Sequence, residues 1–485
     1  MLKKIALWVV GIVVVLALAW WLLLRPDPAD LSEAQLTGPH PKLAKADAET
    51  IPTVVIAEPI GWKANEAPVP AAGLVVSRFA QGLPHPRTLL TLPNGDVLVA
   101  ETNSQPRKGG GIAGAVMNWL LDKAGAGVAS PDRIDLLRDG DGDGVAEQTF
   151  VLRQGLRSPF GMALREAKDG TALLVANTDA VLSFPFKPGD TAITGDPVKL
   201  MDLPGGGMHW ARNLLLSPDG SKLYVSVGSS SNIAEDGIDK ETGRAAIHEY
   251  DFAKKSHRVF ASGMRNTNGM DWNPASGELW AVVNERDMLG SDLVPDYLTN
   301  VPFGVHYGWP WVYWKDNLDM RVHEPAPEYV LNYIRKPEYA LGSHVAPLGM
   351  VFARGGHRMG ERYADGAFVA RHGSWNRKPL SGYDVIFVPF DARGNVTKAQ
   401  PLPVLGGFLT GHGKTRGRPT WLAWAKDGAL LVSDDTAGVI WRVIDPRAQP
   451  AKGVAAVQSS SVGERVVLPE SLRGNVTAPN EQFNN

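Results

Sequence analysis

Six copies of one short pattern constrain the fold of this chain more than any other feature of its sequence. Each copy is a short strand-like stretch, a turn usually built on Asp-Gly or Asn-Gly, and a second stretch of alternating apolar residues. The copies begin at Pro86, Pro159, Trp210, Asn266, Pro347 and Arg418. Asp-Gly and Asn-Gly favour hairpin turns because both residue types tolerate positive φ. A lone hairpin cannot bury its faces, so the copies must stack on one another.

Stacked hairpins of this number predict an all-β fold, a six-bladed β-propeller over residues 71–445, with four-stranded blades around a channel. Further strand-like pairs lie between the copies, as the blades require. The last blade is expected to close the ring by pairing Val439–Val443 with Gly73–Phe79. A β-sandwich, or several separate β domains, is the alternative that six like hairpins disfavour.

Outside the repeats, three segments differ in composition. Residues 1–25 hold an apolar run, Ile5–Leu24, after Lys3 and Lys4, and this pattern predicts a transmembrane anchor with the rest of the chain outside the cytoplasm. A signal peptide cleaved after Ala17–Ala19 is the alternative. Residues 26–70 read as a linker, and residues 446–485 as a polar tail.

Composition excludes several classes of function. The net charge is −2, so nothing favours nucleic acid as a partner. The chain has no cysteine, which excludes disulfides, thiolate catalysis, zinc–thiolate sites and covalent haem attachment. If the protein performs redox chemistry, its electrons must therefore pass to a separate carrier.

The starts of the first strands and the ends of the second strands should lie at one mouth of the channel, and both are polar. The strand starts carry His85, Ser158, His209, Arg265, Asn266, His344, Arg416 and Arg418. The strand ends carry Glu101–Asn103, Asn177–Asp179, Ser229, Asn284–Arg286, His372 and Asp434–Asp435. Each histidine alone is more often structural than catalytic. Their convergence on one face favours a functional site.

The chemistry of these residue types indicates a base and an anion site. A neutral imidazole at His209 would serve as a general base near neutral pH. The guanidinium groups of Arg265, Arg416 and Arg418 suit carboxylates, because a guanidinium pairs with a carboxylate through two hydrogen bonds. A base beside several arginines suggests a bound anionic cofactor in addition to a substrate.

Five stretches of the chain resemble the pyrroloquinoline-quinone (PQQ) sugar dehydrogenases, with the sorbosone dehydrogenase-like branch as the closest likeness. They are GGGMHWARNLLLSPDG, SGMRNTNGMDWNP, VPFGVHYGWPWVYW, FVARHGSWNRKPLSGYDVIFVPF and GRPTWLAWAKDGALLVSDD. The resemblance covers about residues 73–443. The motifs are fairly specific as a set and weak singly.

The resemblance implies roles for particular residues. His209 is implied as the base that takes the hydroxyl proton while hydride passes to the quinone. Arg265 and Asn266 are implied to contact the quinone oxygens, and Arg416 and Arg418 to hold the cofactor's carboxylates. His372 stands roughly where soluble glucose dehydrogenases of the family carry a cofactor-binding lysine. The calcium ion that polarises the quinone in the family is implied at the backbone of Asn284 and Glu285.

A second calcium site is expected in LLRDGDGDGVAEQTF. Asp139, Asp141, Asp143 and Glu147 fall at positions 1, 3, 5 and 9 of a loop with glycine at position 6, which suits an oxygen cage for Ca²⁺. Position 12 is Phe150, so the loop is not an EF-hand. A solvated acidic turn is the alternative. We expect this calcium to be structural, because the loop should connect blades one and two.

One glycine-rich motif resembles a dinucleotide-binding site but is not expected to form one. GGGIAG, residues 109–114, matches the dinucleotide fingerprint in spelling only, because eight polar residues separate it from the preceding strand. The apolar segment behind it predicts a short helix that lines or covers the cavity.

Together these features favour a periplasmic quinoprotein dehydrogenase, anchored in the inner membrane of a bacterium. It would oxidise a sugar, sugar aldehyde or polyol and pass electrons to a membrane quinone or a cytochrome, and the aromatic run HYGWPWVYW from His306 would stack on the sugar ring. A calcium-dependent lactonase and a non-catalytic propeller scaffold are the alternatives.

Overall fold

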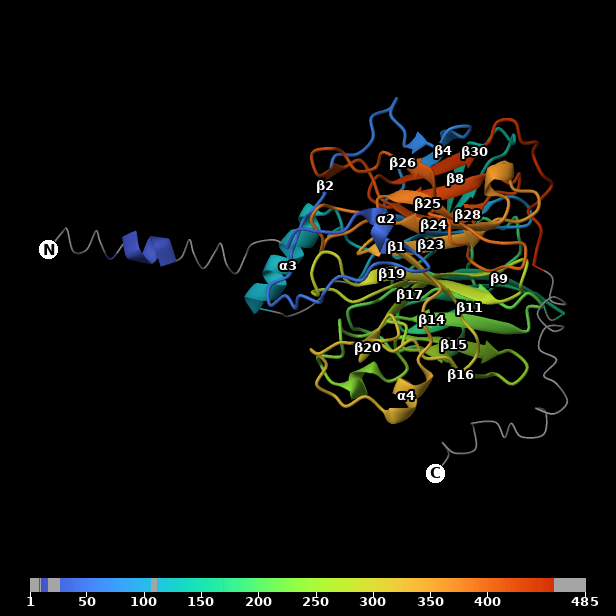
Figure 1. Ribbon diagram of the computed structural model, residues 1–485. Helices are drawn as coiled ribbons and strands as arrows, with labels where there is room; N and C mark the ends of the chain where they lie inside the picture. Colours follow the sequence, from blue (N-terminus) through green and yellow to red (C-terminus); the bar gives the residue numbers. More distant parts are fainter. Residues whose placement is uncertain (1–7, 9, 16–26, 106–110, 169, 458–485) are drawn as a thin grey trace.

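The computed structural model describes residues 8, 10–15, 27–105, 111–168 and 170–457. Six antiparallel sheets of four strands each, two of them extended by a fifth, follow one another around a ring (Figure 1). The predicted six-bladed β-propeller is therefore confirmed, and each repeat in the sequence forms the two inner strands of one blade.

In blades 1 to 5 the strands run from the channel outward in chain order, and in blade 6 the outermost strand comes from the start of the propeller. Blade 1 is β5 (Pro86–Thr91), β6 (Val97–Glu101), β7 (Arg133–Arg138) and β8 (Gln148–Gln154). Blade 2 is β9 (Met162–Ala167), β10 (Gly170–Ala176), β11 (Ala180–Pro185) and β12 (Val198–Asp202). Blade 3 is β13 (Leu214–Leu216), β14 (Lys222–Val227), β15 (Ala246–Asp251) and β16 (Ser256–Ser262). Blade 4 is β17 (Asn266–Trp272), β18 (Leu279–Asn284), β19 (Pro295–Asn300) and β22 (Tyr339–Ser343). Blade 5 is β23 (Pro347–Phe352), β24 (Gly366–Arg371), β25 (Asp384–Pro389) and β26 (Leu402–Gly406). Blade 6 is β28 (Pro419–Trp424), β29 (Leu430–Asp434), β30 (Val439–Ile444) and β4 (Val75–Gln81).

Shorter elements lie in the connections. They are the helices α2 (Glu33–Leu36), α3 (Gly111–Lys123) and α4 (Glu328–Tyr333), the 3₁₀ turns Ile238–Glu241 and Glu361–Tyr363, and the short strands β1 (Thr37–Gly38), β2 (Glu58–Pro59), β3 (Val69–Pro70), β20 (Val312–Tyr313), β21 (Asn317–Leu318) and β27 (Lys414–Thr415).

The second strand of each blade is buried on both faces, which explains why it reads as a continuous apolar run. In β6, Val97 and Val99 pack into the cluster shared with blade 6, whereas Leu98 and Ala100 pack into the cluster shared with blade 2. One such cluster fills each of the six spaces between neighbouring blades. The hydrophobic core is thus divided into six slabs between the sheets.

Glycines let the inner strands approach one another closely around the channel. A Cβ on Gly349 would lie 2.6 Å from the Cα of Trp421 in the next blade, and a Cβ on Gly161 would lie 2.3 Å from the backbone nitrogen of Leu214. Neither distance is compatible with a real side chain. The backbones of neighbouring blades therefore touch at these points, and the ring is narrow there.

The ring closes where the sequence predicted. Strand β4 pairs antiparallel with β30, with Val76 opposite Val443 and Arg78 opposite Trp441. One blade is thus built from both ends of the propeller, and the same pairing ties residues 75–81 to residues 439–444.

Residues 27–70, which composition predicted to be a linker, are packed against the propeller. Strand β1 extends blade 4 beside β22, β2 runs parallel to β27, and β3 extends blade 5 beside β26. Between these strands, the backbone N–H groups of Glu49 and Val55 donate to Met288 O and Trp375 O. Backbone hydrogen bonds that have no apolar signature in the sequence hold this segment, which we call the N-terminal arm.

The two ends of the chain bear on predictions that stay open. Of the apolar run at residues 5–24, only residues 8 and 10–15 are described, and they are helical. No helix within the described ranges has both the length and the apolar character needed to span a membrane. The predicted polar tail lies beyond the described residues from residue 458 on, while residues 446–457 still pack on the ring, with the N–H of Ala451 donating to Asp427 O.

Candidate active site

In blades 1, 4, 5 and 6 the first residue of the inner strand pairs with the last residue of the second strand, and in blades 2 and 3 it pairs one or two residues before that end. The polar positions singled out in the sequence therefore meet at one end of the ring. Pro86 lies opposite Glu101, Asn266 opposite Asn284, and Pro419 opposite Asp434. We call this end the mouth. The loops that follow the second strands, including the one with α3, emerge on this side.

Two buried arginines fix the glycine run that carries His209. Arg212 donates from Nη1 to the carbonyl of His209 (2.8 Å) and from Nη2 to that of Pro204 (2.8 Å). Arg244 donates from Nη2 to the carbonyls of Gly205 and Gly206 at 2.6 and 3.2 Å. Arg212 is fully buried, and burial lowers its pKa to about 9. The histidine is therefore held at the mouth by its own loop backbone.

The ring of His209 is oriented by Ser229 from the end of the second strand of blade 3. Its Nδ1 lies 3.0 Å from both the carbonyl oxygen and the Oγ of Ser229. Because Nδ1–H donates to the carbonyl, Nε2 carries the free lone pair. Burial, reinforced by the charge of Arg265, holds the pKa of His209 well below its usual range. The imidazole is neutral and able to accept a proton at Nε2.

Asn266 lies beside this histidine, as the resemblance implied. A Cβ added to Gly228 would lie 2.4 Å from Asn266 Oδ1 and 2.7 Å from the Cβ of His209. Both side chains therefore cover the same glycine, and only a residue without a side chain leaves room for them.

Most of the N–H donors of Arg265 form hydrogen bonds with other groups of the protein. Its Nε donates to Asn232 O (3.1 Å), its Nη1 to Glu285 O (2.6 Å), and its Nη2 to Asn232 Oδ1 (2.9 Å) and Asp287 Oδ2 (3.0 Å). Of the five guanidinium hydrogens, one on Nη1 is left for a ligand. Arg265 thus has a structural role in addition to the contact that the resemblance implied.

Asp287 is the centre of this network, although the sequence did not single it out. Its Oδ1 lies 3.3 Å from His344 Nδ1, and its Oδ2 accepts from Arg265. Burial alone would raise the pKa of Asp287, but Arg265 and His344 hold it below its usual value. The same contact raises the pKa of His344 despite burial. Only the position of the loop after β18 could have signalled this residue.

A second polar group gathers around Asp435. His372 Nε2 lies 2.9 Å from Asp435 Oδ2, Arg87 Nη1 forms an ion pair with the same oxygen, and His85 Nε2 lies 3.9 Å away. Although burial would raise the pKa of Asp435, His372 and Arg87 hold it well below the usual range. The imidazole of His372 is therefore engaged by a carboxylate, and Arg87 is a residue that sequence reasoning missed.

Arg418 is a buried cation without an acidic partner. It is 8% exposed, its Nη2 donates to the Tyr383 hydroxyl (3.1 Å), and its guanidinium lies 5.1 Å from the centre of that ring. Its Nε has no hydrogen-bond partner, and no carboxylate within the described ranges forms an ion pair with it. A buried charge left in this state favours an anionic ligand.

The two members of the predicted R-x-R pair have different partners. Arg416 Nε lies 3.5 Å from Glu66 Oε2, and its guanidinium lies 5.8 Å from the ring of Trp62. Both partners belong to the N-terminal arm, a contact that the sequence did not predict. The joint role of Arg416 and Arg418 at a cofactor stays a prediction, and Arg418 is the more deeply buried of the two.

The residues predicted to hold the cofactor's calcium are engaged with protein groups. The amide of Asn284 donates to Pro347 O (2.7 Å), and the carboxylate of Glu285 pairs with Arg286 (3.0 Å). The carbonyl of Glu285 accepts from Arg265, and its N–H donates to Asp296. The predicted ligands are backbone carbonyls, and that of Glu285 already accepts from Arg265, so calcium at this place stays a prediction.

The aromatic run predicted to stack on a sugar packs into the core instead. Tyr307, Trp309 and Trp314 are 2%, 3% and 6% exposed. The indole N–H of Trp309 donates to Asn232 O, so this ring supports the backbone beside Arg265. The run is apolar enough to be buried, and the interface between blades 3 and 4 takes it up. At the mouth, Trp375 is 37% exposed.

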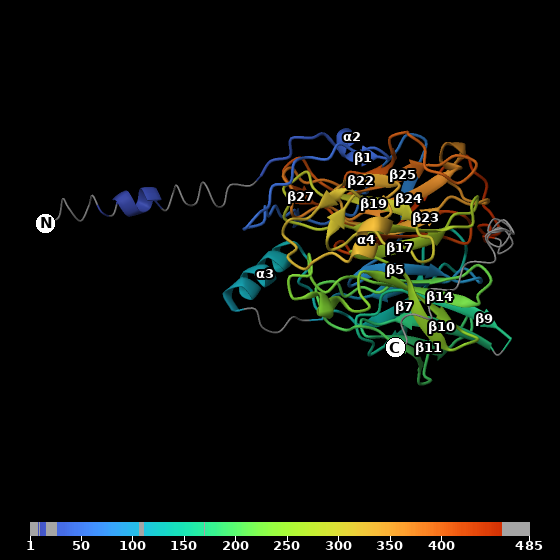
Figure 2. The same cartoon turned by 60° about the horizontal axis from the view of Figure 1, so that its bottom comes forward.

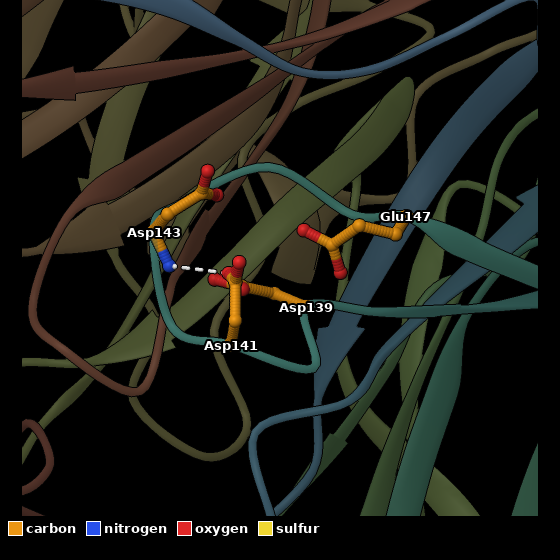
Figure 3. Close-up of side chains that lie close together, drawn as sticks. All are labelled: Asp139, Asp141, Asp143 and Glu147. Atoms are coloured by element: carbon orange, nitrogen blue, oxygen red, sulfur yellow. Dashed lines mark hydrogen bonds between the residues drawn. The ribbon is translucent and has the colours of Figure 1, made fainter.

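The acidic loop brings its four predicted carboxylates together at the opposite end of the ring (Figure 3). It lies within blade 1, between β7 and β8, and not between blades 1 and 2 as predicted, because β8 is the outer strand of blade 1. One ligand oxygen from each of Asp139, Asp141, Asp143 and Glu147 lies within 4.8 Å of the others. Asp139 accepts from the N–H groups of Gly142 (2.7 Å) and Gly144 (2.9 Å), which shapes the turn. The loop has the geometry of the oxygen cage that the spacing predicted, and binding of calcium stays a prediction.

The glycine run at residues 109–114 does not follow a strand. Strand β6 ends at Glu101 and α3 begins at Gly111. The dinucleotide fingerprint requires the strand to run directly into the glycines. The predicted short helix is confirmed. The glycine run matches the dinucleotide fingerprint in its letters only, without the strand that such a site needs.

Two curated proteins illustrate what this chain resembles. An uncharacterized protein of Borreliella burgdorferi is 32% identical over 238 residues, 49% of this chain and 60% of that protein. A pyrroloquinoline quinone-dependent pyranose dehydrogenase of Coprinopsis cinerea is 24% identical over 430 residues, 76% of this chain and 57% of that protein. The matched region thus spans at most 60% of the length of these two relatives.

Solved structures show the same architecture. The holo form of the PQQ domain of the Coprinopsis cinerea pyranose dehydrogenase superposes with a TM-score of 0.61 at 22% identity, covering 80% of this chain and all of that one. A family model described as TrAA12-like matches residues 68–300 and 328–446, which include all six blades. The chain therefore belongs to the TrAA12-like family.

Proposed function

We propose that this protein oxidises a sugar, sugar aldehyde or polyol with PQQ as its redox cofactor, and that His209 is the base. The observation that carries the proposal is the placement of His209: its Nδ1 lies 3.0 Å from the carbonyl oxygen of Ser229, and no described residue forms a hydrogen bond with its Nε2. The relatives that share the fold and carry a named activity are PQQ-dependent sugar oxidoreductases.

The residues present fit an anionic cofactor. Arg418 offers a buried, unpaired Nε–H, and Arg265 offers one remaining N–H on Nη1. Asn266 lies beside His209 at the same place. We propose that Arg418 holds a cofactor carboxylate, that Arg265 and Asn266 contact the quinone oxygens, and that His372 lines the same site. Bound PQQ would supply the two-electron acceptor for the hydride.

The chain's own residues would handle the proton. As the substrate carbon loses hydride, its hydroxyl proton moves to His209 Nε2, and the alcohol becomes a carbonyl. The negative charge of Asp287 favours the imidazolium formed in this step, and Arg265 disfavours it. A base with a lowered pKa then returns its proton to solvent readily. Asp287 thus acts on the base through the field of its charge.

His209→Ala separates chemistry from binding. We expect it to keep PQQ affinity, because the cofactor is held by arginines, and to lose turnover by about 10²- to 10⁴-fold, the usual worth of a general base. PQQ binding is measured by fluorescence titration, and turnover with a panel of sugars and sugar aldehydes and a dye acceptor. Near wild-type turnover with any substrate would show that His209 is structural.

Arg418→Gln should give the opposite pattern. Loss of a hydrogen bond to a charged group weakens binding by roughly 10- to 100-fold, with rate recovered at high PQQ. Arg416→Gln is the matched control, since its side chain is held by Glu66 and Trp62. A smaller loss for Arg416→Gln is expected. Equal losses would support the paired role that the sequence suggested, and no saturable PQQ binding in wild type would remove the proposal.

We further propose the sorbosone dehydrogenase-like branch for the substrate, and the inner membrane, with the propeller in the periplasm, for the location. The apolar run at residues 5–24 and the absence of cysteine support an anchored protein that passes electrons to a separate quinone or cytochrome. Fractionation of the full chain, with a protease accessibility assay on intact cells, tests the location.

The alternative of a calcium-dependent lactonase is disfavoured by the state of the acids at the mouth. Glu285 pairs with Arg286, and Asp434 accepts from Trp62 Nε1 and the N–H of Arg418. Within the described ranges, the acidic loop at the far end of the ring is the one group of His, Asp or Glu side chains close enough to share a metal. A lactonase metal would need such a group at the mouth.

A further inference from the structure

Helix α3 is a surface helix that is mostly apolar. Apart from Gly114 and Asn118, every residue from 112 to 121 is apolar. Asn118 and Asp122 lie four positions apart and form one narrow polar stripe, and a helix as apolar as this is normally buried. Figures 1 and 2 show that α3 instead stands off the propeller. The side chain of Trp119 is 55% exposed, and that of Val128 behind the helix is 46% exposed.

The base of this helix is anchored to the mouth. Asn103, just after β6, donates from Nδ2 to the carbonyls of Ala126 (2.9 Å) and Val128 (2.8 Å). A Cβ on Gly125 would lie 3.0 Å from Pro59 and 3.2 Å from Thr436, so the end of the helix packs between the N-terminal arm and blade 6. The helix is thus a fixed projection of the mouth face.

The chain leaves the propeller toward its N-terminus on the same face. The N–H of Ser291 donates to Asp27 Oδ2 (3.0 Å), and Ser291 lies in the loop after β18, at the mouth. The apolar run at residues 5–24 ends only three positions before Asp27. A bilayer that holds this run must therefore lie close to the mouth face and to α3.

Charges flank the apolar stretch in the way that lipid headgroups favour. Arg107 and Lys108 precede it in the sequence, and Lys123 ends it, with Asp122 as the one acid. Lys123 Nζ lies 4.6 Å from the centre of the Trp119 ring. Tryptophan and lysine side chains are enriched where an apolar helix meets the headgroup region of a bilayer. A protein partner would not by itself explain why the helix shares its face with the anchor.

We propose that α3 lies in the headgroup region of the bilayer that holds the N-terminal run, so that the mouth of the propeller faces the membrane. The inference rests on the proposed anchor and extends it: two separate contacts fix the orientation of the ring, where one tether would leave it free. A membrane-borne quinone then reaches the mouth directly, and the electron acceptor is drawn from the lipid phase.

The cysteine-free chain allows a direct test. Trp119→Cys and Val198→Cys are made in the full chain, labelled with an environment-sensitive fluorophore and reconstituted into vesicles of phosphatidylcholine and phosphatidylglycerol with brominated lipids. Val198 is the control, since it is 63% exposed on β12, an outer strand of blade 2. We expect several-fold stronger quenching at residue 119. Ala115→Cys, another exposed position of α3, gives the same readout if Trp119→Cys folds poorly.

The outcomes separate this inference from the proposed function. If the chain floats with the vesicles but positions 119 and 115 are quenched no more than 198, α3 does not dock and the anchor still stands. If the chain does not float with vesicles at all, both the anchor and the docking are wrong. Neither result depends on PQQ. If the stronger quenching persists in vesicles without phosphatidylglycerol, α3 still docks on the bilayer. The attraction of its basic residues to anionic lipid is then refuted, and the docking is not.

Discussion

Glu101 is a buried carboxyl group at the end of β6, at the mouth. It is fully buried, its Oε2 accepts from the N–H of His85 (2.7 Å), and its Oε1 has no partner within the described ranges. Burial raises the pKa of Glu101 to about 8, and the nearby charge of Asp135 acts in the same direction. The folded protein therefore keeps this group protonated at neutral pH.

The raised pKa makes stability depend on pH. Below about pH 4.5, the folded and unfolded states both carry the proton. As the pH rises from there to about 8, the unfolded state loses the proton and the folded state keeps it, so stability falls, and it levels off above that range. Glu101→Gln cannot ionise, so we expect its melting temperature to decline less between pH 5 and pH 8.5.

The measurement is a series of thermal melts at fixed ionic strength. Glu166→Gln, an exposed carboxyl in blade 2, is the matched control and should follow the wild type. If Glu101→Gln shows the same pH dependence as the wild type, Glu101 is ionised in the folded protein.

Residues differ in how far the sequence could predict their roles. The position of His209 was predictable, because the glycine run lies directly before a strand start in the sequence. Such a position depends only on neighbouring residues. Asp287 was not predictable, because its contacts with Arg265 and His344 join residues 22 and 57 positions apart. The contact of Arg416 with Glu66 was not predictable for the same reason, since Glu66 lies in the N-terminal arm.

At the scale of elements, the turn residues and apolar alternation predicted all six hairpins, because both signals act within a few residues. The N-terminal arm was missed because contacts between residues far apart in the chain hold it, such as the ion pair of Glu33 with Arg371 and the hydrogen bond from Trp62 to Asp434. The aromatic run from His306 was expected to line a binding site but lies in the core, because aromatic residues are common in both places.

A glycine on an inner strand provides a test of how the blades pack. A Cβ on Gly349 would lie 2.6 Å from Trp421 Cα and 2.7 Å from Leu422 N, both backbone atoms of the next blade. We expect Gly349→Ala to destabilise the protein by about 1–3 kcal/mol through overpacking. The free energy of unfolding is measured by urea denaturation.

Gly406→Ala, in β26 of the same blade, is the control, because an added Cβ there meets nothing within 4 Å. It should lie within about 1 kcal/mol of wild type, since loss of a glycine also restricts the unfolded chain. Equal stability of the two variants would mean that neighbouring inner strands separate easily.

At the scale of the whole molecule, the acidic loop touches the blade that closes the ring. The N–H of Ala146 donates to Phe79 O in β4 (2.8 Å), and a Cβ on Gly144 would lie 2.7 Å from Arg442 Nε in β30. The loop therefore bridges blade 1 to both strands of the closure. We propose that calcium in this loop stabilises the joint where the ring would open first.

Asp141→Ala tests this joint. Loss of one ligand weakens calcium binding to the folded state, so the stabilisation by the ion, which reaches about 2.7 kcal/mol at a hundredfold excess over Kd, should shrink. We expect the melting temperature of the wild type to rise with Ca²⁺ and fall with chelator, and that of Asp141→Ala to change little. Asp236→Ala, an exposed acid in blade 3, should respond like the wild type. If wild type and Asp141→Ala melt alike with and without Ca²⁺, the loop is an acidic turn, and β4 and β30 close the ring through their own pairing.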